Sequence, residues 1–178
     1  MDSVDNANRR PAAPVRAYVG LGSNQADPVR QVRAALTDLA GLPRTALVVR
    51  SSLYRSAPMG PPDQPDYVNA VAGLDSGLSA LELLHALQAI ETAHGRVRSG
   101  ERWGPRTLDL DLLLYDEARF DSPELTVPHP GLHRRAFVLY PLGEIAAELS
   151  IPGQGKLATL LARVSPEGLE RVQDHDQL

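Results

Sequence analysis

The pattern of apolar and polar residues along the chain predicts alternating strands and helices. Short apolar or β-branched runs that stop at glycine or proline indicate strands, whereas apolar residues spaced three and four apart indicate helices. In chain order, the sequence predicts a strand at 17–21, a helix at 28–39, strands at 45–54 and 67–75, a helix at 79–91 and a strand at 108–114. This order is a split βαβ arrangement. We therefore expect an α+β fold of the ferredoxin-like type, with a βαββαβ core, an antiparallel sheet and helices packed on one face.

Both predicted core helices begin at a recognisable capping signal. Asp27 and Pro28 supply an N-cap residue and a proline at the first helical position. Ser79 and Glu82 have the spacing of a capping box. Beyond the core, the pattern predicts a small hairpin arm at 120–127 and C-terminal helices at 132–148 and 157–164.

The length and composition fit one globular domain. A chain of 178 residues can bury a substantial core, and 43% hydrophobic with 22% charged residues is ordinary for a soluble protein. No apolar run reaches the roughly eighteen residues of a membrane span, and the start of the chain lacks the apolar segment of a secretory signal. We therefore expect a cytoplasmic protein with a disordered leader at 1–15, a single domain at 16–164 and a flexible tail at 165–178.

Charge and cysteine content exclude several classes of function. The chain has no cysteine, which rules out disulfides, thiolate metal sites and a cysteine nucleophile. A net charge of −4 argues against a general nucleic-acid-binding protein. The basic residues are 17 arginines and Lys156 alone, so an arginine-rich segment is not by itself a sign of a binding site.

The most informative segment spans residues 96–115 and reads RVRSGERWGPRTLDLDLLLY. Within its predicted strand, Asp109 and Asp111 are two residues apart and therefore point to one face, while the alternating leucines face the core. Their Cα atoms would lie roughly 7 Å apart, which suits carboxylates that share two metal ions about 4 Å apart. Two ionised aspartates on a buried strand repel unless a cation lies between them, and Mg²⁺ takes oxygen ligands of this kind.

Four arginines and the single tryptophan precede this strand, namely Arg96, Arg98, Arg102, Trp103 and Arg106. A guanidinium binds phosphate oxygens bidentately and stays charged, so arginines, carboxylates and a large aromatic residue together indicate a nucleoside-triphosphate site. For the arginines alone, a solvated loop with surface ion pairs is an equal alternative. The standard glycine motifs are incomplete, because Gly155 and Lys156 lack the following Ser or Thr of a P-loop, and Gly20 and Gly22 lack the third glycine of a dinucleotide fold.

Several segments of the chain together resemble one known family. They are GSN at 22–24, SAPMGPPDQPDYVN at 56–69, RWGPRTLDLDL at 102–112 and VPHP at 127–130, with Glu91, Arg96, Arg98, Arg135 and Phe137. From about residue 17 to residue 148, the chain is similar to the 6-hydroxymethyl-7,8-dihydropterin pyrophosphokinase family of folate biosynthesis.

This resemblance implies transfer of diphosphate from ATP to the hydroxymethyl group of 6-hydroxymethyl-7,8-dihydropterin, with release of AMP. It implies a catalytic set of Arg96, Arg106, Asp109 and Asp111, in which the two aspartates bind two Mg²⁺ ions. The residues implied in ATP binding are Gln88, Arg98, Arg102, Trp103, Leu112, Thr126, His129 and Arg135. Those implied in pterin binding are Ser56, Ala57, Met59, Tyr67, Asn69, Trp103 and Phe137, with the ring held between Tyr67 and Phe137.

Three positions depart from the family pattern. Ala57 stands where a second proline is common, Ser99 where a basic residue often lies, and Glu124 where an arginine can contact the nucleotide. These departures bear on ATP affinity and on loop motion rather than on the reaction.

Two other functions compete with this interpretation. One is a different Mg²⁺-dependent nucleotide transferase or hydrolase with another acceptor. The other is a non-catalytic nucleic-acid-binding module on a ferredoxin-like sheet, against which an aromatic content of 4% and the acidic net charge both count. Without the resemblance, Tyr67, Asn69 and Phe137 would fit ordinary sheet and core packing. We expect a monomer whose partners are ATP and hydroxymethyl-dihydropterin, with neither nucleic acid nor a membrane among them.

Overall fold

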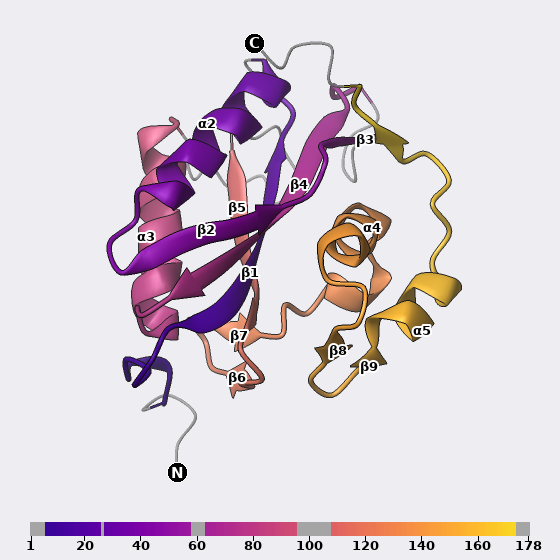
Figure 1. Ribbon diagram of the computed structural model, residues 1–178. Helices are drawn as coiled ribbons and strands as arrows, with labels where there is room; N and C mark the ends of the chain where they lie inside the picture. Colours follow the sequence, from indigo (N-terminus) through magenta and orange to yellow (C-terminus); the bar gives the residue numbers. More distant parts are fainter. Residues whose placement is uncertain (1–5, 26, 58–62, 96–107, 174–178) are drawn as a thin grey trace.

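An antiparallel sheet organises the part of the chain that the computed structural model describes, which is residues 6–25, 27–57, 63–95 and 108–173. Its strands are β1 (Val15–Ser23), β2 (Thr45–Arg50), β3 (Tyr54–Ser56), β4 (Tyr67–Ser76), β5 (Asp109–Tyr115) and β10 (Glu170–Arg171). β1 lies between β4 and β5, and both β2 and β3 pair with β4. This topology confirms the predicted α+β fold with a ferredoxin-like βαββαβ core (Figure 1).

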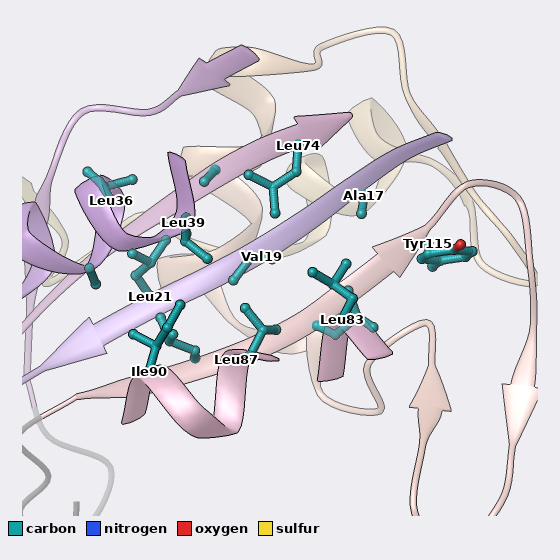
Figure 2. Close-up of a cluster of buried hydrophobic side chains, with 14 of the residues drawn as sticks. Ala17, Val19, Leu21, Leu36, Leu39, Leu74, Leu83, Leu87, Ile90 and Tyr115 are labelled. Carbon is teal, nitrogen blue, oxygen red and sulfur yellow. The ribbon is translucent and has the colours of Figure 1, made fainter. Parts of the chain in front are cut away.

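Helices cover both faces of this sheet. They are α2 (Pro28–Ala40), α3 (Ala80–Ala93), the 3₁₀ turn η1 (Leu132–Arg134), α4 (Ala136–Ile145) and α5 (Leu157–Arg163). On one face, α2 and α3 bury a cluster that includes Val19 and Leu83 (Figure 2). On the other face, α4 and α5 bury a second cluster that includes Val71 and Leu139. The prediction of helices on one face therefore holds for α2 and α3 only.

The second face needs a cover because β5 supplies apolar side chains to both faces. A β-bulge interrupts the pairing of β1 with β5 between Tyr18 and Val19. Leu112 belongs to the first buried cluster, whereas Leu113 and Leu114 both belong to the second. A bulge changes the alternation of a strand locally, so two successive leucines contribute to one apolar surface. This surface is buried by α4.

The strand expected at 45–54 is in fact two strands. At the break, Ser51 N donates to Val71 O at 2.8 Å, while Ser51 Oγ accepts a hydrogen bond from Val71 N at 2.9 Å. The hydroxyl thus takes the place of a backbone carbonyl and ends the first ladder. β3 then starts at Tyr54 and pairs with the beginning of β4.

The C-terminal part of the chain has more structure than the sequence predicted. Its short hairpins are β6 (Phe120–Asp121) with β7 (Thr126–Val127), and β8 (Ser150–Ile151) with β9 (Gly155–Lys156). The first confirms the arm expected at 120–127, and the second was not predicted. The helix expected at 132–148 is interrupted, because Arg135 is extended (φ −105°, ψ 108°) between η1 and α4. None of the helices in the described part of the chain has the length and hydropathy needed to cross a bilayer.

Both ends of the domain have partners that the sequence did not indicate. Ala7 is buried, and Arg10 donates to both carboxylate oxygens of Glu82 (2.9 and 2.8 Å). At the other end, β10 pairs with β3 and extends the sheet. These contacts involve described residues of the segments expected as a leader at 1–15 and a tail at 165–178, and the disorder expected of the two segments stays a prediction.

Candidate active site

The predicted metal residues share one face of the sheet with Tyr67 and Asn69 of the predicted pterin set. Directly opposed residues of antiparallel strands point to the same face. In the observed register, Asp109 opposes Gly22, Gly22 opposes Asn69, and Asn69 opposes Tyr54. A single row across four strands therefore brings a carboxylate, an amide and a phenol to the same surface, on the side covered by α4. Asp111 belongs to the next such row and opposes Gly20.

The two glycines of β1, Gly20 and Gly22, leave the middle of this surface without side chains. A Cβ atom on Gly22 would lie 3.0 Å from Asn69 Oδ1 and 3.9 Å from Tyr67 Cδ1. A Cβ atom on Gly20 would lie 3.4 Å from Leu113 Cδ2. The absence of a side chain at Gly22 thus gives Asn69 its space. The sequence showed these glycines but gave no reason for them beyond an incomplete nucleotide motif.

The aspartates of β5 have the alternation that the sequence predicted. Asp109 and Asp111 are partly exposed, whereas Leu108, Leu110 and Leu112 are at most 5% exposed on the other side of the strand. In the described residues, no group of three or more metal-ligating side chains is gathered in one place. Two carboxylates nevertheless fit Mg²⁺, which completes its shell with water and substrate phosphates.

His129 stands beside this carboxylate pair. Its Nδ1 accepts a hydrogen bond from Gly131 N at 3.2 Å, so the neutral ring carries its proton on Nε2. Nε2 lies 3.9 Å from Asp111 Oδ1. Burial lowers the pKa of His129 below its ordinary value, Arg135 lowers it further, and Asp109 partly opposes both. A neutral His129 presents an N–H donor on the metal side of the site.

The buried acid Glu91 holds β5 between its two aspartates. Glu91 is 3% exposed, and its Oε2 accepts a hydrogen bond from Leu110 N at 2.9 Å. Since β5 ends the sheet, this N–H points away from β1 and needs another acceptor. Sequence reasoning gave Glu91 no role. An acid on the apolar stripe of a helix, next to Ile90 and four residues after Leu87, was the available signal.

Three of the predicted pterin residues, Ser56, Tyr67 and Asn69, come together at one end of β4. Ser56 opposes Tyr67 in the pairing of β3 with β4, and Asn69 Nδ2 donates to Ser56 Oγ at 2.7 Å. Ala57 follows directly after β3 and is exposed. Phe137 comes from α4, with the Arg135 guanidinium 5.8 Å from its ring centroid. Met59 lies outside the described residues.

Three of the predicted nucleotide residues come from elements that meet at β5, the edge strand of the sheet. Gln88 lies on α3, Leu112 on β5 and Thr126 on β7. His85 of α3 is paired with Glu124 in the β6–β7 turn, and this contact joins the two elements. Glu124, which departs from the family pattern, therefore has a partner within the protein. Thr126 and His129 also line a cavity of about 330 Å³. The remaining predicted residues, Arg96, Arg98, Arg102, Trp103 and Arg106, lie outside the described residues.

Comparison with known proteins decides the family. A model of the family described as 7,8-dihydro-6-hydroxymethylpterin-pyrophosphokinase (HPPK) matches residues 18–147. The chain belongs to this family. It is 55% identical over 157 residues to the 2-amino-4-hydroxy-6-hydroxymethyldihydropteridine pyrophosphokinase of Pseudomonas aeruginosa, covering 88% of this chain and 96% of that protein. It is 50% identical over 147 residues to the protein of the same name from Haemophilus influenzae, covering 83% and 91%.

Solved structures share the HPPK fold with this chain. Wild-type Plasmodium falciparum HPPK-DHPS with pteroate superposes with a TM-score of 0.64 at 12% identity, covering 84% of this chain and 42% of that one. An HPPK-DHPS in complex with substrates gives a TM-score of 0.65 at 9% identity, covering 85% and 43%. The chain thus spans less than half the length of these solved chains, and the likeness concerns the fold alone.

The role of Glu91 leads to a stability prediction. Glu91→Ala removes the acceptor of a buried backbone N–H, so the free energy of unfolding should fall by about 1–3 kcal/mol. Glu91→Gln keeps a carbonyl oxygen and should lose less. Urea unfolding of both variants, with the exposed Glu117→Ala as control, measures the difference. An unchanged stability of Glu91→Ala would show that Leu110 N does not depend on this carboxylate.

The environment of His129 leads to a prediction about pH. The pKa of His129 in the folded protein is lowered from 6.5, its value in the unfolded chain. As pH falls, His129 is therefore protonated in the unfolded chain before it is protonated in the folded protein. The free energy of unfolding should therefore fall as pH is lowered from about 6.5 to the folded pKa, and His129→Asn should lessen that fall. An NMR titration of the metal-free and nucleotide-free protein gives the midpoint directly. A His129 midpoint at or above 6.5 would contradict the lowered pKa and the neutral ring that it implies.

Proposed function

We propose that this chain transfers the diphosphate group of ATP to the hydroxymethyl group of 6-hydroxymethyl-7,8-dihydropterin and releases AMP. The activity is proposed because the chain matches the family over residues 18–147. The observation that carries the site is the row in which Asp109 and Asn69 flank Gly22 on one face of the sheet. A triphosphate held near Asp109 and a pterin held near Asn69 would be neighbours across β1. We further propose a cytoplasmic monomer that acts on these two substrates without nucleic acid.

The proposed metal site consists of Asp109 and Asp111 with two Mg²⁺ ions. The partial exposure of both carboxylates and their place on one face support it. Bound Mg²⁺ would neutralise charge on the triphosphate, which is the largest electrostatic requirement of phosphoryl transfer. Among this chain's own residues, Arg96 and Arg106 would stabilise charge on the transferring group. The neutral His129 would donate a hydrogen bond from its Nε2–H group to a phosphate oxygen.

The proposed pterin site has two aromatic walls and one amide. Tyr67 and Phe137 would contact the faces of the flat heterocycle, and Asn69 would both donate to and accept from its polar edge. The contact of Asn69 Nδ2 with Ser56 Oγ supports this arrangement, because it fixes the amide next to Tyr67. The remaining proposed contacts at the pterin are Ala57, Met59 and Trp103.

The proposed nucleotide site extends from the metal along the edge of β5. Gln88, Leu112 and Thr126 would hold the nucleoside, and the meeting of α3, β5 and β7 at this edge supports their grouping. The proposed contacts to the phosphates and ribose are Arg98, Arg102, Trp103, His129 and Arg135. All of them are donors or aromatic groups, as an anionic ligand with a flat base requires.

An assay of AMP release tests the function directly. The protein is incubated with ATP, Mg²⁺ and the reduced pterin, and the nucleotide products are separated. The proposal requires AMP in amounts equal to the pterin consumed and no turnover when the pterin is left out. Release of ADP, or AMP release that does not need the pterin, would support a different nucleotide transferase or a hydrolase.

The metal assignment predicts opposite effects on catalysis and on stability. Asp111→Asn and Asp109→Asn keep the size of the side chain but remove a ligand charge, so turnover should fall by orders of magnitude. The melting temperature of each metal-free variant should stay equal or rise slightly, because repulsion between the carboxylates is relieved. Direct Mg²⁺ titration by calorimetry should show weaker binding.

The control for the metal assignment lies at the end of the same strand. Asp116 is exposed and has a positive φ of 52°, which asparagine tolerates. Asp116→Asn should therefore keep both turnover and Mg²⁺ affinity. Near-normal turnover of either Asp109→Asn or Asp111→Asn at ordinary Mg²⁺ concentration would remove that aspartate from the site.

A further inference from the structure

Glu144 on α4 fastens this helix to the segment between β2 and β3. Its Oε1 accepts hydrogen bonds from Ser52 N (3.0 Å) and Ser52 Oγ (2.6 Å). Its Oε2 accepts from Ser52 N (3.1 Å) and from the Tyr54 hydroxyl (2.6 Å). Burial acts to raise the pKa of Glu144, but the hydrogen bonds from Ser52 and Tyr54 outweigh it and the pKa lies below its ordinary value.

The two ends of this contact lie on elements that supply different residues of the proposed pterin site. Tyr54 opposes Asn69 in the pairing of β3 with β4. Phe137 lies seven residues before Glu144, about two helical turns, so both side chains share one side of α4. The carboxylate of Glu144 therefore connects the helix that carries Phe137 to the strand next to Asn69.

The C-terminal strand completes the connection. Arg171 of β10 donates from Nη2 to the Tyr54 hydroxyl at 3.2 Å, and the same atom lies 3.7 Å from Glu144 Oε2. Its guanidinium lies 5.6 Å from the Tyr54 ring centroid. The Arg171 side chain is 61% exposed, so this ion pair contributes little to stability. Arg171 thus contacts both the hydroxyl and the ring of Tyr54.

Apolar packing alone does not fix the rotation of α4. Val138, Leu139 and Leu142 bury the helix against the sheet in the second cluster. Such burial is non-directional, whereas hydrogen bonds require defined angles and distances. The four hydrogen bonds to Glu144, together with that from the Tyr140 hydroxyl to Val164 O at 2.7 Å, therefore restrict the rotation of α4 about its axis, on which the position of Phe137 depends.

We propose that Glu144, acting through Ser52 and Tyr54, is a positioning residue that sets the separation between Phe137 and β4, and hence the width of the pterin site. The inference rests on the proposed function, in which Phe137 and Asn69 contact the pterin. A misplacement of about 1 Å in such a site can cost up to a hundredfold in rate. In this role the C-terminal strand β10 contributes Arg171, which donates a hydrogen bond to the Tyr54 hydroxyl.

Binding measurements on Glu144→Gln and Tyr54→Phe test this role. Calorimetry gives the Kd of the pterin in the presence of Mg²⁺ and a non-hydrolysable ATP analogue, and the Kd of the analogue itself. Glu144→Gln should weaken pterin binding by up to about tenfold, the worth of one aromatic stacking contact, and leave the analogue within about twofold. Tyr54→Phe removes one hydrogen bond and should have a smaller effect of the same kind. Glu148→Gln, an exposed acid shortly after α4, is the matched control and should leave both affinities unchanged.

The outcomes separate this inference from the proposed function. If the wild-type protein fails to bind the pterin, the proposed function fails and the positioning role fails with it. If the wild type binds and Glu144→Gln lowers only the melting temperature while the pterin Kd stays unchanged, the carboxylate is merely structural and the inference is overturned. Should Glu144→Gln not fold, Tyr54→Phe decides alone, and an unchanged pterin Kd in that variant overturns the inference.

Discussion

The site depends on the central strand of the sheet having no side chains where the two substrates would meet. Gly22 lies between Asp109 and Asn69, and Gly20 lies beside Asp111. Because opposed residues in antiparallel strands share a face, any side chain at Gly22 would project between the carboxylate and the amide. A Cβ atom there would already be 3.0 Å from Asn69 Oδ1. The two proposed binding surfaces can therefore be adjacent only because β1 has no side chain at this point.

Two carboxylates that do not face the substrates hold the borders of this surface. Glu91 accepts the outward N–H of Leu110 on the edge strand, and Glu144 accepts the N–H of Ser52 at the gap between β2 and β3. Both positions leave a backbone donor without a sheet partner, and a charged acceptor there forms a stronger hydrogen bond than a neutral one. Glu91 and Glu144 thus hold strands in place, whereas Asp109 and Asp111 are the proposed metal ligands.

Local patterns predicted most of the fold and part of the site, and long-range partners account for the rest. The alternation of leucines with Asp109 and Asp111 was enough to place both carboxylates on one face, and Asp27 and Ser79 marked true helix starts. The break at Ser51 could not be predicted, because its hydroxyl replaces a carbonyl only when Val71 lies opposite. The pairing of β10 with β3 likewise depends on an open strand edge that is remote in sequence. The roles of Arg96 and Arg106 remain predictions.

The most direct test of the bare-strand account is the pterin affinity of Gly22→Ala, measured by calorimetry with Mg²⁺ and a non-hydrolysable ATP analogue present. The added Cβ must displace Asn69, so the pterin Kd should rise by about tenfold or more while the Kd of the analogue stays close to that of the wild type. Gly20→Ala is the comparison, since its Cβ would meet Leu113 at 3.4 Å and leave Asn69 untouched. A Gly22→Ala variant that folds and binds the pterin as tightly as the wild type would contradict the account.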